Sequence, residues 1–521
     1  MDTKALRQKI LDLAIRGKLV PQDPNDEPAS VLLERIRAEK QQMVKDGKLK
    51  PKDIKNDTVI FKGDDNLHYE KFSDGIVKCI EDEIPFDVPN NWEWVRIKTA
   101  CVINPRNSID DNTEVSFVPM ANIKEGYANK FISDIRVWKK VKKGYTHFAN
   151  NDIGIAKITP CFENKKSVVF SSLINGYGAG TTELYILRTI SSLVIPEYLL
   201  NFVKRDDFIA GGVLTFSGDV GQQRVTKDYV ANYLFTLPPL NEQQRILNAV
   251  HTATSLIESI EKANDNLIRD IDKTKAKILD LAIRGKLVPQ DPNDEPASVL
   301  LERIRAEKEE LIKQGKIKRD KKESVIFKGD DNSYYQDLPS NWIKIRLSTI
   351  SEIITKGTTP RGGKVAYRQS GIGFLRAENI AGYDKLDLSN LNYVDEESHN
   401  NYLKRSILKE NDILITIAGT LGRTAIVPQQ ALPLNTNQAV AIVRLVNNRL
   451  INVKYLVYAL NSPIIKSDLL AKSVDMAIPN LSLENIADCN ISLPPLTEQK
   501  RIVDEIEKIF AILDDIANQV A

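Results

Sequence analysis

The stretch KILDLAIRGKLVPQDPNDEPASVLLERIRAEK, residues 9–40, occurs a second time without a single change at residues 277–308. Shorter blocks follow each copy in the same order: VIFKGDDN (59–66 and 325–332), PNNW and PSNW (89–92 and 339–342), and LPPLNEQQRI and LPPLTEQKRI (237–246 and 493–502). An internal repeat of this length indicates a repeated structural unit. We therefore predict that the chain consists of two copies of one unit.

The segments between these blocks, about 92–236 and 342–492, resemble each other only faintly. Traces of a common origin remain in NDIGIAKI (151–158) beside NDILITIA (411–418). Such traces predict one fold that carries two different surfaces. Identical segments can bind two copies of one partner, whereas divergent segments recognise different things.

A coiled-coil seam follows the first LPPL block. Seam positions recur in alternating steps of four and three, which is the spacing of a heptad repeat. They include Ile246, Val250, Ile257, Ile260, Asn264, Leu267, Ile271 and Ile278. Asn264 at an a position could fix the helix register or could face solvent. Glu242 suits the first turn of this helix and Gly285 its end. At ~1.5 Å per residue, residues 241–284 would span about 66 Å.

A second seam begins after the other LPPL block and stops at the last residue, Ala521. Its positions are Ile502, Ile506, Ile509, Leu513 and Ile516. Leu6, Ile10 and Leu13 continue the same pattern at the amino terminus. The repeat is therefore circular, and a pseudo-twofold axis would make the two long helices antiparallel. The alternative is that they are ordinary core helices of one domain.

The remaining composition is that of a soluble globular protein, with 42% apolar and 27% charged residues in 521. No run of 18 apolar residues occurs, and the start is a charged amphipathic helix, so we expect a cytoplasmic protein without membrane contact. The four cysteines (Cys79, Cys101, Cys161 and Cys489) are scattered, and only four histidines accompany them. We expect free thiols and no metal site.

Positive charge gathers in the variable segments. Residues 90–236 and 340–492 each carry four more Lys and Arg than Asp and Glu, although the whole chain is only +2. Basic side chains suit phosphates, while Arg, Gln and Asn can pair with base edges in the major groove. The DNA-binding candidates are Lys139, Lys140, Lys142, Lys143, Lys165, Lys166, Gln222, Gln223 and Arg224 in the first segment, and Lys356, Thr358, Thr359, Arg361, Lys364, Arg368, Arg376 and Asn379 in the second. Each group could instead be an ordinary solvated face.

Taken together, the chain resembles the specificity subunits of type I restriction-modification enzymes. The resemblance covers nearly the whole chain and rests on two L-P-P-L-x-E-Q blocks, each followed by a long helix. It implies two target-recognition domains that each read half of a bipartite DNA site, with the helices setting the gap. It also implies two methyltransferase subunits, which use S-adenosylmethionine to methylate adenine, and two restriction subunits, which use ATP and Mg.

The sequence lacks the catalytic motifs expected of a methyltransferase or an ATPase, which supports this interpretation. The Pro-Pro pairs stand in LPPL blocks rather than in an Asn- or Asp-Pro-Pro-aromatic tetrapeptide, and no phosphate-binding G-x-x-x-x-G-K-[ST] loop occurs. We therefore expect a non-catalytic subunit with no cofactor in this chain. Three other interpretations stay open: a subunit of a type IIB-like enzyme, a stand-alone two-headed DNA-binding regulator, and a scaffold without a DNA role.

The expected fold is mixed α/β, with two pseudo-repeated recognition domains separated by a long antiparallel two-helix coiled coil and a circular pseudo-twofold organisation. DIGIAKI, KSVVFSSL, DILITIAG and QAVAIVRL are predicted strands because they are rich in β-branched residues. The expected divisions are 1–58 (amino-terminal helical segment and linker), 59–240 (first recognition domain), 241–324 (central helix and linker), 325–496 (second recognition domain) and 497–521 (carboxy-terminal helix).

Overall fold

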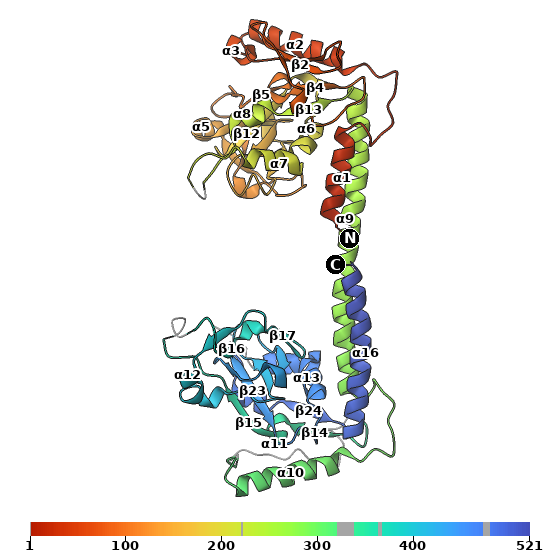
Figure 1. Ribbon diagram of the computed structural model, residues 1–521, viewed down its shortest axis with the longest axis vertical. Coiled ribbons are helices and arrows are strands. Elements are labelled where there is room, and N and C mark those ends of the chain that lie inside the picture. Colours follow the sequence, from red (N-terminus) through yellow and green to blue (C-terminus); the bar gives the residue numbers. More distant parts are fainter. Residues whose placement is uncertain (1, 220–221, 320–337, 363–366, 472–479, 521) are drawn as a thin grey trace. The chain divides into compact units, whose positions relative to one another are not determined.

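The computed structural model describes residues 2–219, 222–319, 338–362, 367–471 and 480–520. The chain forms two compact units, Met1–Lys262 and Ala263–Ala521, each a mixture of helices and sheets (Figure 1). The predicted mixed fold with two repeated domains is confirmed. No helix in the described ranges is long and apolar enough to cross a membrane.

The first unit contains two four-stranded sheets. One has the order β10-β9-β12-β5, and the other has the order β7-β6-β11-β8 with β6 and β11 parallel. Their strands are β5 Cys101–Ile103, β6 Glu114–Val118, β7 Asp134–Val137, β8 Thr146–Ala149, β9 Ile153–Ala156, β10 Ser167–Val169, β11 Tyr177–Gly180 and β12 Leu184–Thr189. Smaller pieces are the pair β4 (Glu93–Arg96) with β13 (Leu234–Leu237) and the three-stranded sheet β1 (Val59–Lys62), β2 (His68–Lys71) and β3 (Val77–Cys79).

The second unit repeats this plan. The sheet β15-β23-β20-β21 corresponds to β5-β12-β9-β10, and β19-β16-β22 corresponds to β7-β6-β11, again with the last two strands parallel. The strands are β14 Ile343–Arg346, β15 Ser351–Lys356, β16 Ile372–Leu375, β17 Ile380–Gly382, β18 Lys385–Leu386, β19 Asn392–Val394, β20 Ile413–Thr416, β21 Thr424–Ile426, β22 Leu434–Thr436, β23 Val440–Leu445 and β24 Asn490–Leu493. The four predicted strand runs are β9, β10, β20 and β23, so those predictions are confirmed.

Helices pack around the sheets of both units. In the first unit they are α1 Thr3–Ile15, α2 Ala29–Lys45, α3 Pro51–Ile54, α4 Ile97–Ala100, α5 Trp138–Val141, α6 Pro196–Val203, α7 Asp206–Val213 and α8 Lys227–Asn232. In the second they are α10 Ala297–Lys313, α11 Leu347–Ile350, α12 Glu396–Asn400, α13 Val453–Asn461, α14 Pro463–Ala471, α15 Leu483–Ala487 and α16 Leu496–Val520. The long helix α9, Leu240–Ile283, contributes residues to both units.

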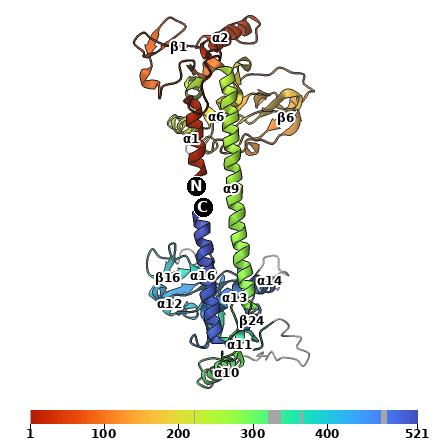
Figure 2. The same cartoon turned by 90° about the vertical axis from the view of Figure 1, so that its right-hand side faces the viewer.

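The long helices pair in an antiparallel manner within each unit (Figure 2). In the first unit Arg7 of α1 contacts Glu261 at 3.0 Å, while the Thr236 hydroxyl, just before α9, donates to the Ile15 carbonyl at the other end of α1. In the second unit Lys275 of α9 pairs with Asp514 of α16, and the Asn264 side chain donates to the Val520 carbonyl at 3.2 Å. Asn264 thus bonds at the end of α16 instead of facing solvent.

The predicted seam is mostly buried. Ile246, Val250, Ile257, Ile271, Ile278, Ile502 and Ile506 are buried, and Ile260, Ile509 and Leu513 are half-buried. The prediction is wrong for Leu267 and Ile516, whose exposed fractions are 38% and 37%. Leu267 on α9 and Ile516 on α16 each lie about one turn from the contact between Asn264 and the Val520 carbonyl.

The repeated sequence blocks meet where each recognition domain joins its helix. Trp92 Nε1 donates to the buried Glu242 carboxylate at 2.9 Å, and Trp342 Nε1 donates to Glu498 at 2.9 Å. Gln22 and Gln290 donate to the other oxygen of the same carboxylates at 2.6 Å. Burying a carboxylate without hydrogen bonds costs folding free energy, so each glutamate requires its tryptophan and glutamine donors. The PxNW, LPPLxEQ and KLVPQ blocks are therefore parts of one junction that the chain builds twice.

The packing beside this junction differs between the units. In the first unit a cavity of about 640 Å³ lies between α1, α6 and α9, lined in part by Asn201 and Thr254. Counting from the shared junction residues, these positions correspond to Tyr458 and Phe510, which are buried in the second unit with ring centroids 5.9 Å apart. Aromatic side chains fill in one copy the space that small polar side chains leave open in the other.

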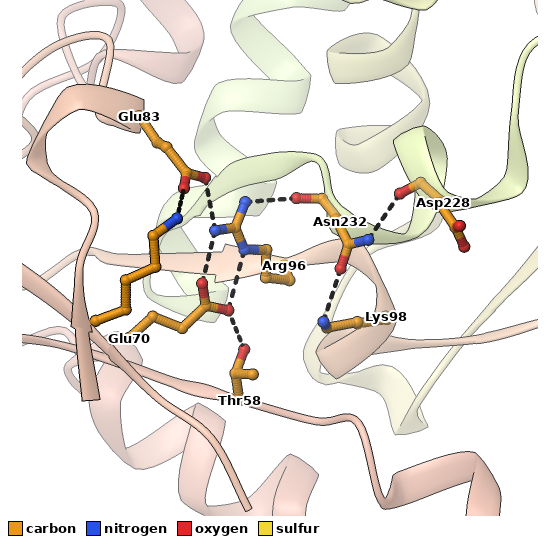
Figure 3. A network of polar contacts seen from close by, with 8 residues as sticks. Thr58, Glu70, Glu83, Arg96, Lys98, Asp228 and Asn232 are labelled. Carbon is orange, nitrogen blue, oxygen red and sulfur yellow. Dashed lines mark hydrogen bonds and ion pairs between the residues drawn. The ribbon is translucent and has the colours of Figure 1, made fainter. Parts of the chain in front are cut away.

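A polar network attaches the three-stranded sheet to the first recognition domain (Figure 3). Arg96 of β4 donates to both carboxylate oxygens of Glu70, to Glu83 at 2.7 Å and to the Asn232 carbonyl at 2.7 Å. Thr58 also donates to Glu70. Burial opposes ionisation of Glu70, but the hydrogen bonds and charge of Arg96 outweigh it and lower the pKa of Glu70. In the second unit the matching Arg346 pairs with Asp488.

Candidate nucleic-acid interface

In the second unit, three loops that follow strands meet around a small pocket. They are the loops after β15, after β16 and after β22. Main-chain bonds fix them to one another, because Thr358 N donates to Thr436 O at 2.9 Å and Asn437 N donates to Leu375 O at 3.2 Å. A Cβ atom at Gly357 would lie 2.2 Å from the Asn437 carbonyl, so this close approach requires glycine. These contacts hold the described loop residues next to the strands in place.

The pocket has a volume of about 370 Å³, and all of its lining residues except Ala377 carry polar or charged side chains. Its lining consists of Thr359, Tyr367, Arg376, Ala377, Glu378, Asn437 and Gln438. Burial raises the pKa of Tyr367, so its hydroxyl stays protonated at neutral pH and can donate a hydrogen bond. Arg376 pairs with Glu378 at the surface. Two predicted DNA-binding residues, Thr359 and Arg376, thus share this pocket.

Further basic side chains lie on or beside the loop after β15. The Arg361 guanidinium lies over the Tyr402 ring at 4.6 Å from its centroid, and Arg405 donates to the Thr358 hydroxyl at 2.9 Å. Lys356 is exposed at the end of β15, and Arg368 is exposed beside Asp395 at 3.2 Å. Lys364 lies outside the described residues. Exposed cations around a polar pocket suit a surface that meets phosphates at its rim.

In the first unit, two of these loops have counterparts at the same backbone positions. Thr181 N donates to Val118 O at 3.4 Å, as Asn437 N does to Leu375 O in the second unit. The backbone N–H of Glu183 then donates to the Thr181 hydroxyl at 3.1 Å, as that of Ala439 does to the Asn437 side chain at 3.2 Å. These bonds align Thr181-Thr182 with Asn437-Gln438. They also align Pro119-Met120 with Arg376-Ala377.

The predicted lysines of the first unit lie mainly on one short helix and the turn after it. Lys139, Lys140 and Lys143 are exposed on and after α5, whereas Lys142 is held by Asp111 at 2.6 Å. Lys166, Gln222 and Gln223 are half-buried or exposed. Arg224 pairs with Glu183 at 2.8 Å, directly after the Thr181-Thr182 turn. No contact among the described residues joins all of these side chains into one cluster.

Two predicted DNA-binding residues have internal roles instead, and the prediction is corrected for them. Lys165 is only 8% exposed, pairs with Asp206 and donates to the Tyr127 hydroxyl at 3.0 Å. Asn379 is 3% exposed, and its side-chain amide donates to the Asp387 and Asn390 carbonyls while its oxygen accepts from Arg376 N. A buried side chain with its hydrogen bonds satisfied has none left for a base.

Sequence reasoning missed Tyr367, Asn437 and Gln438, which complete the pocket. A side-by-side comparison of the two copies could have signalled the last two, because GTTEL in one copy stands where TNQAV stands in the other. Within the described ranges, no group of three His, Cys, Asp or Glu side chains is arranged to hold a metal ion.

Known proteins resemble this chain in sequence over nearly its whole length. Residues 89–269 and 339–521 each match the family described as "Type I restriction modification DNA specificity domain". The chain is 35% identical to the specificity subunit of the type I restriction enzyme EcoEI from Escherichia coli, over 99% of this chain and 90% of that protein. It is 34% identical to the EcoAI specificity subunit from the same organism, over 97% and 89%.

A solved structure shares the fold. It belongs to a study of complex assembly and conformational transition in a type I restriction-modification system, and it matches with a TM-score of 0.57 at 18% identity. The match covers 84% of this chain and 94% of that chain.

Proposed function

The chain belongs to the family of type I restriction-modification DNA specificity subunits, and we propose that it reads a DNA site made of two separate halves. Each unit would read one half-site with its own recognition domain. The paired long helices would set the length of the unread gap between the halves. Specificity for two different half-sites requires two different reading surfaces on one shared fold.

The observation that carries this proposal is the contrast between the equivalent loops. The parallel strand pair and the main-chain bond that joins its two turns are the same in both units, whereas Pro119 and Thr182 stand in one where Arg376 and Gln438 stand in the other. A scaffold without a DNA role would have no physical reason to keep the loop backbone and change its hydrogen-bonding groups. Readers of different sequences have that reason.

The repeated block supports two copies of one partner. The exposed residues Glu34, Arg35 and Glu39 of α2 recur as Glu302, Arg303 and Glu307 of α10, with the same exposure. Just beyond the identical block, exposed positions change, as Gln42 does to Glu310. Packing places no demand on exposed side chains, so a shared binding partner accounts for their identity better than the fold does.

We assign these two surfaces to two methyltransferase subunits, with two restriction subunits completing the enzyme. The chain itself would be non-catalytic and would act in the cytoplasm. S-adenosylmethionine, ATP and Mg would belong to the partner subunits. Adenine N6 methylation and DNA cleavage would then occur only where this chain places its partners.

Methylome sequencing tests the proposal. A host that expresses the chain with its neighbouring genes should gain one methylated-adenine motif made of two short halves around a fixed gap, compared with a host that lacks the chain. If the assembled complex yields no new motif, or yields a single undivided one, the two-half proposal is wrong.

A further inference from the structure

A side chain with free hydrogen-bonding groups stands at the rim of the pocket in the second unit. Gln438 is exposed at the turn after β22 and makes no hydrogen bond to any described residue. Its neighbour Asn437 is different, because the Asn437 side-chain oxygen accepts from Ala439 N at 3.2 Å. Gln438 therefore keeps both a donor and an acceptor for a ligand, at a position whose backbone is fixed by the adjoining main-chain bonds.

Arg376 stands across the same pocket with a weakly engaged guanidinium. Its side chain is 31% exposed, and its acidic partner Glu378 is 61% exposed. Ion pairs between such exposed groups contribute little, so Arg376 can leave Glu378 for a better acceptor at small cost. Its backbone is tied down, since Arg376 N donates to the buried Asn379 side chain at 2.9 Å and Asn379 N donates back to Arg376 O.

Glutamine and arginine side chains can both pair with the major-groove edge of a purine base. A glutamine amide pairs bidentately with N6 and N7 of adenine, and an arginine fork pairs with O6 and N7 of guanine. Both ligands are therefore the major-groove edge of a purine. These two side chains line one pocket together with Thr359 and Tyr367, and the four side chains supply the donors and acceptors that such an edge requires.

The matching positions in the first unit cannot read a purine in this way. Pro119 has no donor, and Thr182 offers one hydroxyl in place of an amide with two ends. The loop bonds are nevertheless retained, so the difference lies in the side chains and not in the backbone.

We propose that Gln438 and Arg376 are specificity-determining residues that read purine edges in the half-site bound by the second unit. This inference rests on the proposed function and assigns the chemistry of one of its two reading surfaces. Gln438 would select adenine at one position, and Arg376 would select guanine at a neighbouring one. The first unit would read its half-site by other contacts.

Two substitutions of Gln438 test the assignment in the complete system, with the methylome of the host as the readout. Gln438→Ala should relax a single adenine position in one half-site, with about a 10-fold loss of discrimination there. Gln438→Glu should move the preference at that same position toward cytosine, because a carboxylate accepts from the cytosine amino group. Thr182→Ala is the matched control, since it alters the equivalent turn of the other unit and should leave this half-site intact.

Arg376→Lys separates base reading from phosphate contact. Lysine keeps the charge but loses the planar fork. A phosphate contact would survive this change, whereas a guanine contact should relax one further position of the same half-site, again by about 10-fold. Binding of the assembled complex to a site with and without the relevant purine, measured at two salt concentrations, should show the loss without a change in salt slope.

The outcomes distinguish this inference from the function on which it rests. A wild-type complex that produces no two-part motif overturns both. A wild-type motif that stays unchanged in the Gln438 and Arg376 variants, or that changes in the half read by the first unit, overturns the pocket assignment alone. Relaxation confined to single positions of one half-site supports it.

Discussion

The two junctions and the two proposed reading surfaces of this chain follow opposite rules. At the junctions, Trp92 and Trp342 donate to Glu242 and Glu498 at the same distance of 2.9 Å, and the flanking glutamines repeat at 2.6 Å. At the reading surfaces the backbone bonds repeat, but the side chains do not. Polar groups are kept where burial makes their loss costly, and they vary where solvent or a ligand can take their place.

The apolar packing beside the junction differs between the two units. The first unit keeps a cavity beside Asn201 and Thr254, whereas the second fills the equivalent space with Tyr458 and Phe510. The difference indicates that the polar junction, and not the apolar packing next to it, is what both copies share. Three changes would break or sharpen this comparison.

Phe510→Thr should have the largest effect, because it gives the second unit the residue that the first unit carries. Phe510 is 9% exposed and contacts the rings of Tyr458 and Tyr383. Removing a buried phenylalanine ring costs about 3 kcal/mol or more, through lost contacts and the cavity left behind. Thermal unfolding, combined with hydrogen exchange to locate the change, should show a lower stability of the second unit.

Thr254→Ala is the control for that substitution. It acts at the matching position of the first unit, beside an existing cavity, and should cost less than about 1 kcal/mol. Equal losses for the two variants would mean that the aromatic cluster contributes nothing special to the second unit.

Glu498→Ala should cause the next largest loss of stability, and the loss should be confined to the second unit. It leaves the buried Trp342 N–H without an acceptor, and an unsatisfied buried group costs about 1–3 kcal/mol. Hydrogen exchange should increase around β14 and the start of α16, and Glu242→Ala should produce the same pattern around β4 and α9 instead.

Asp504→Ala provides the surface control on the same helix, since Asp504 is exposed. A change in the unit opposite to the mutated junction would contradict the view that each junction serves its own recognition domain.

Acidification should have the smallest effect, and in the first unit it should act on the three-stranded sheet β1–β3. The pKa values of Glu70 and Glu83 are lowered, because burial of each carboxyl is outweighed by hydrogen bonds from Arg96 and its charge. A lowered pKa in the folded state gives stability that is present above the unfolded value of about 4.3 and is lost as pH falls through the folded value. Hydrogen exchange of β1–β3 should therefore rise below about pH 4.

Arg96→Ala should remove this pH dependence by exposing the same strands already at neutral pH. Arg346→Ala in the second unit is the matched control, and it should leave the three-stranded sheet unchanged. An Arg96→Ala variant whose sheet still opens only in acid would show that other groups anchor it.

The repeated units and the long helix could be predicted because they rest on local signals. Heptad spacing places Ile246, Val250 and Ile257 in the seam, and runs of β-branched residues identify β9 and β20. The faint common trace NDI also has a local reason. Asn151 and Asn411 adopt positive φ, and Asp152 and Asp412 pair with Arg188 and Arg444.

The reading surface was harder to predict because it depends on residues far apart in sequence. Lys165 looks like a free cation until Asp206 and Tyr127 are brought beside it by the fold. Gln438 looks like any loop glutamine until β22 places it across a pocket from Arg376. Charge and residue type singled out the loop after β15 as a DNA-binding candidate, but contacts decide which of its side chains are available.

The junction has a consequence for how such proteins acquire new targets over evolutionary time. Its hydrogen bonds join a tryptophan just before β4 or β14, and a glutamine of the repeated block, to a glutamate at the start of α9 or α16. They involve none of the recognition loops in between. Mutation or recombination can therefore rewrite a recognition loop while the attachment of the domain is inherited unchanged. Under the proposed function, selection by new DNA invaders could act on one half of the target at a time, and the partner subunits would not need to change with it.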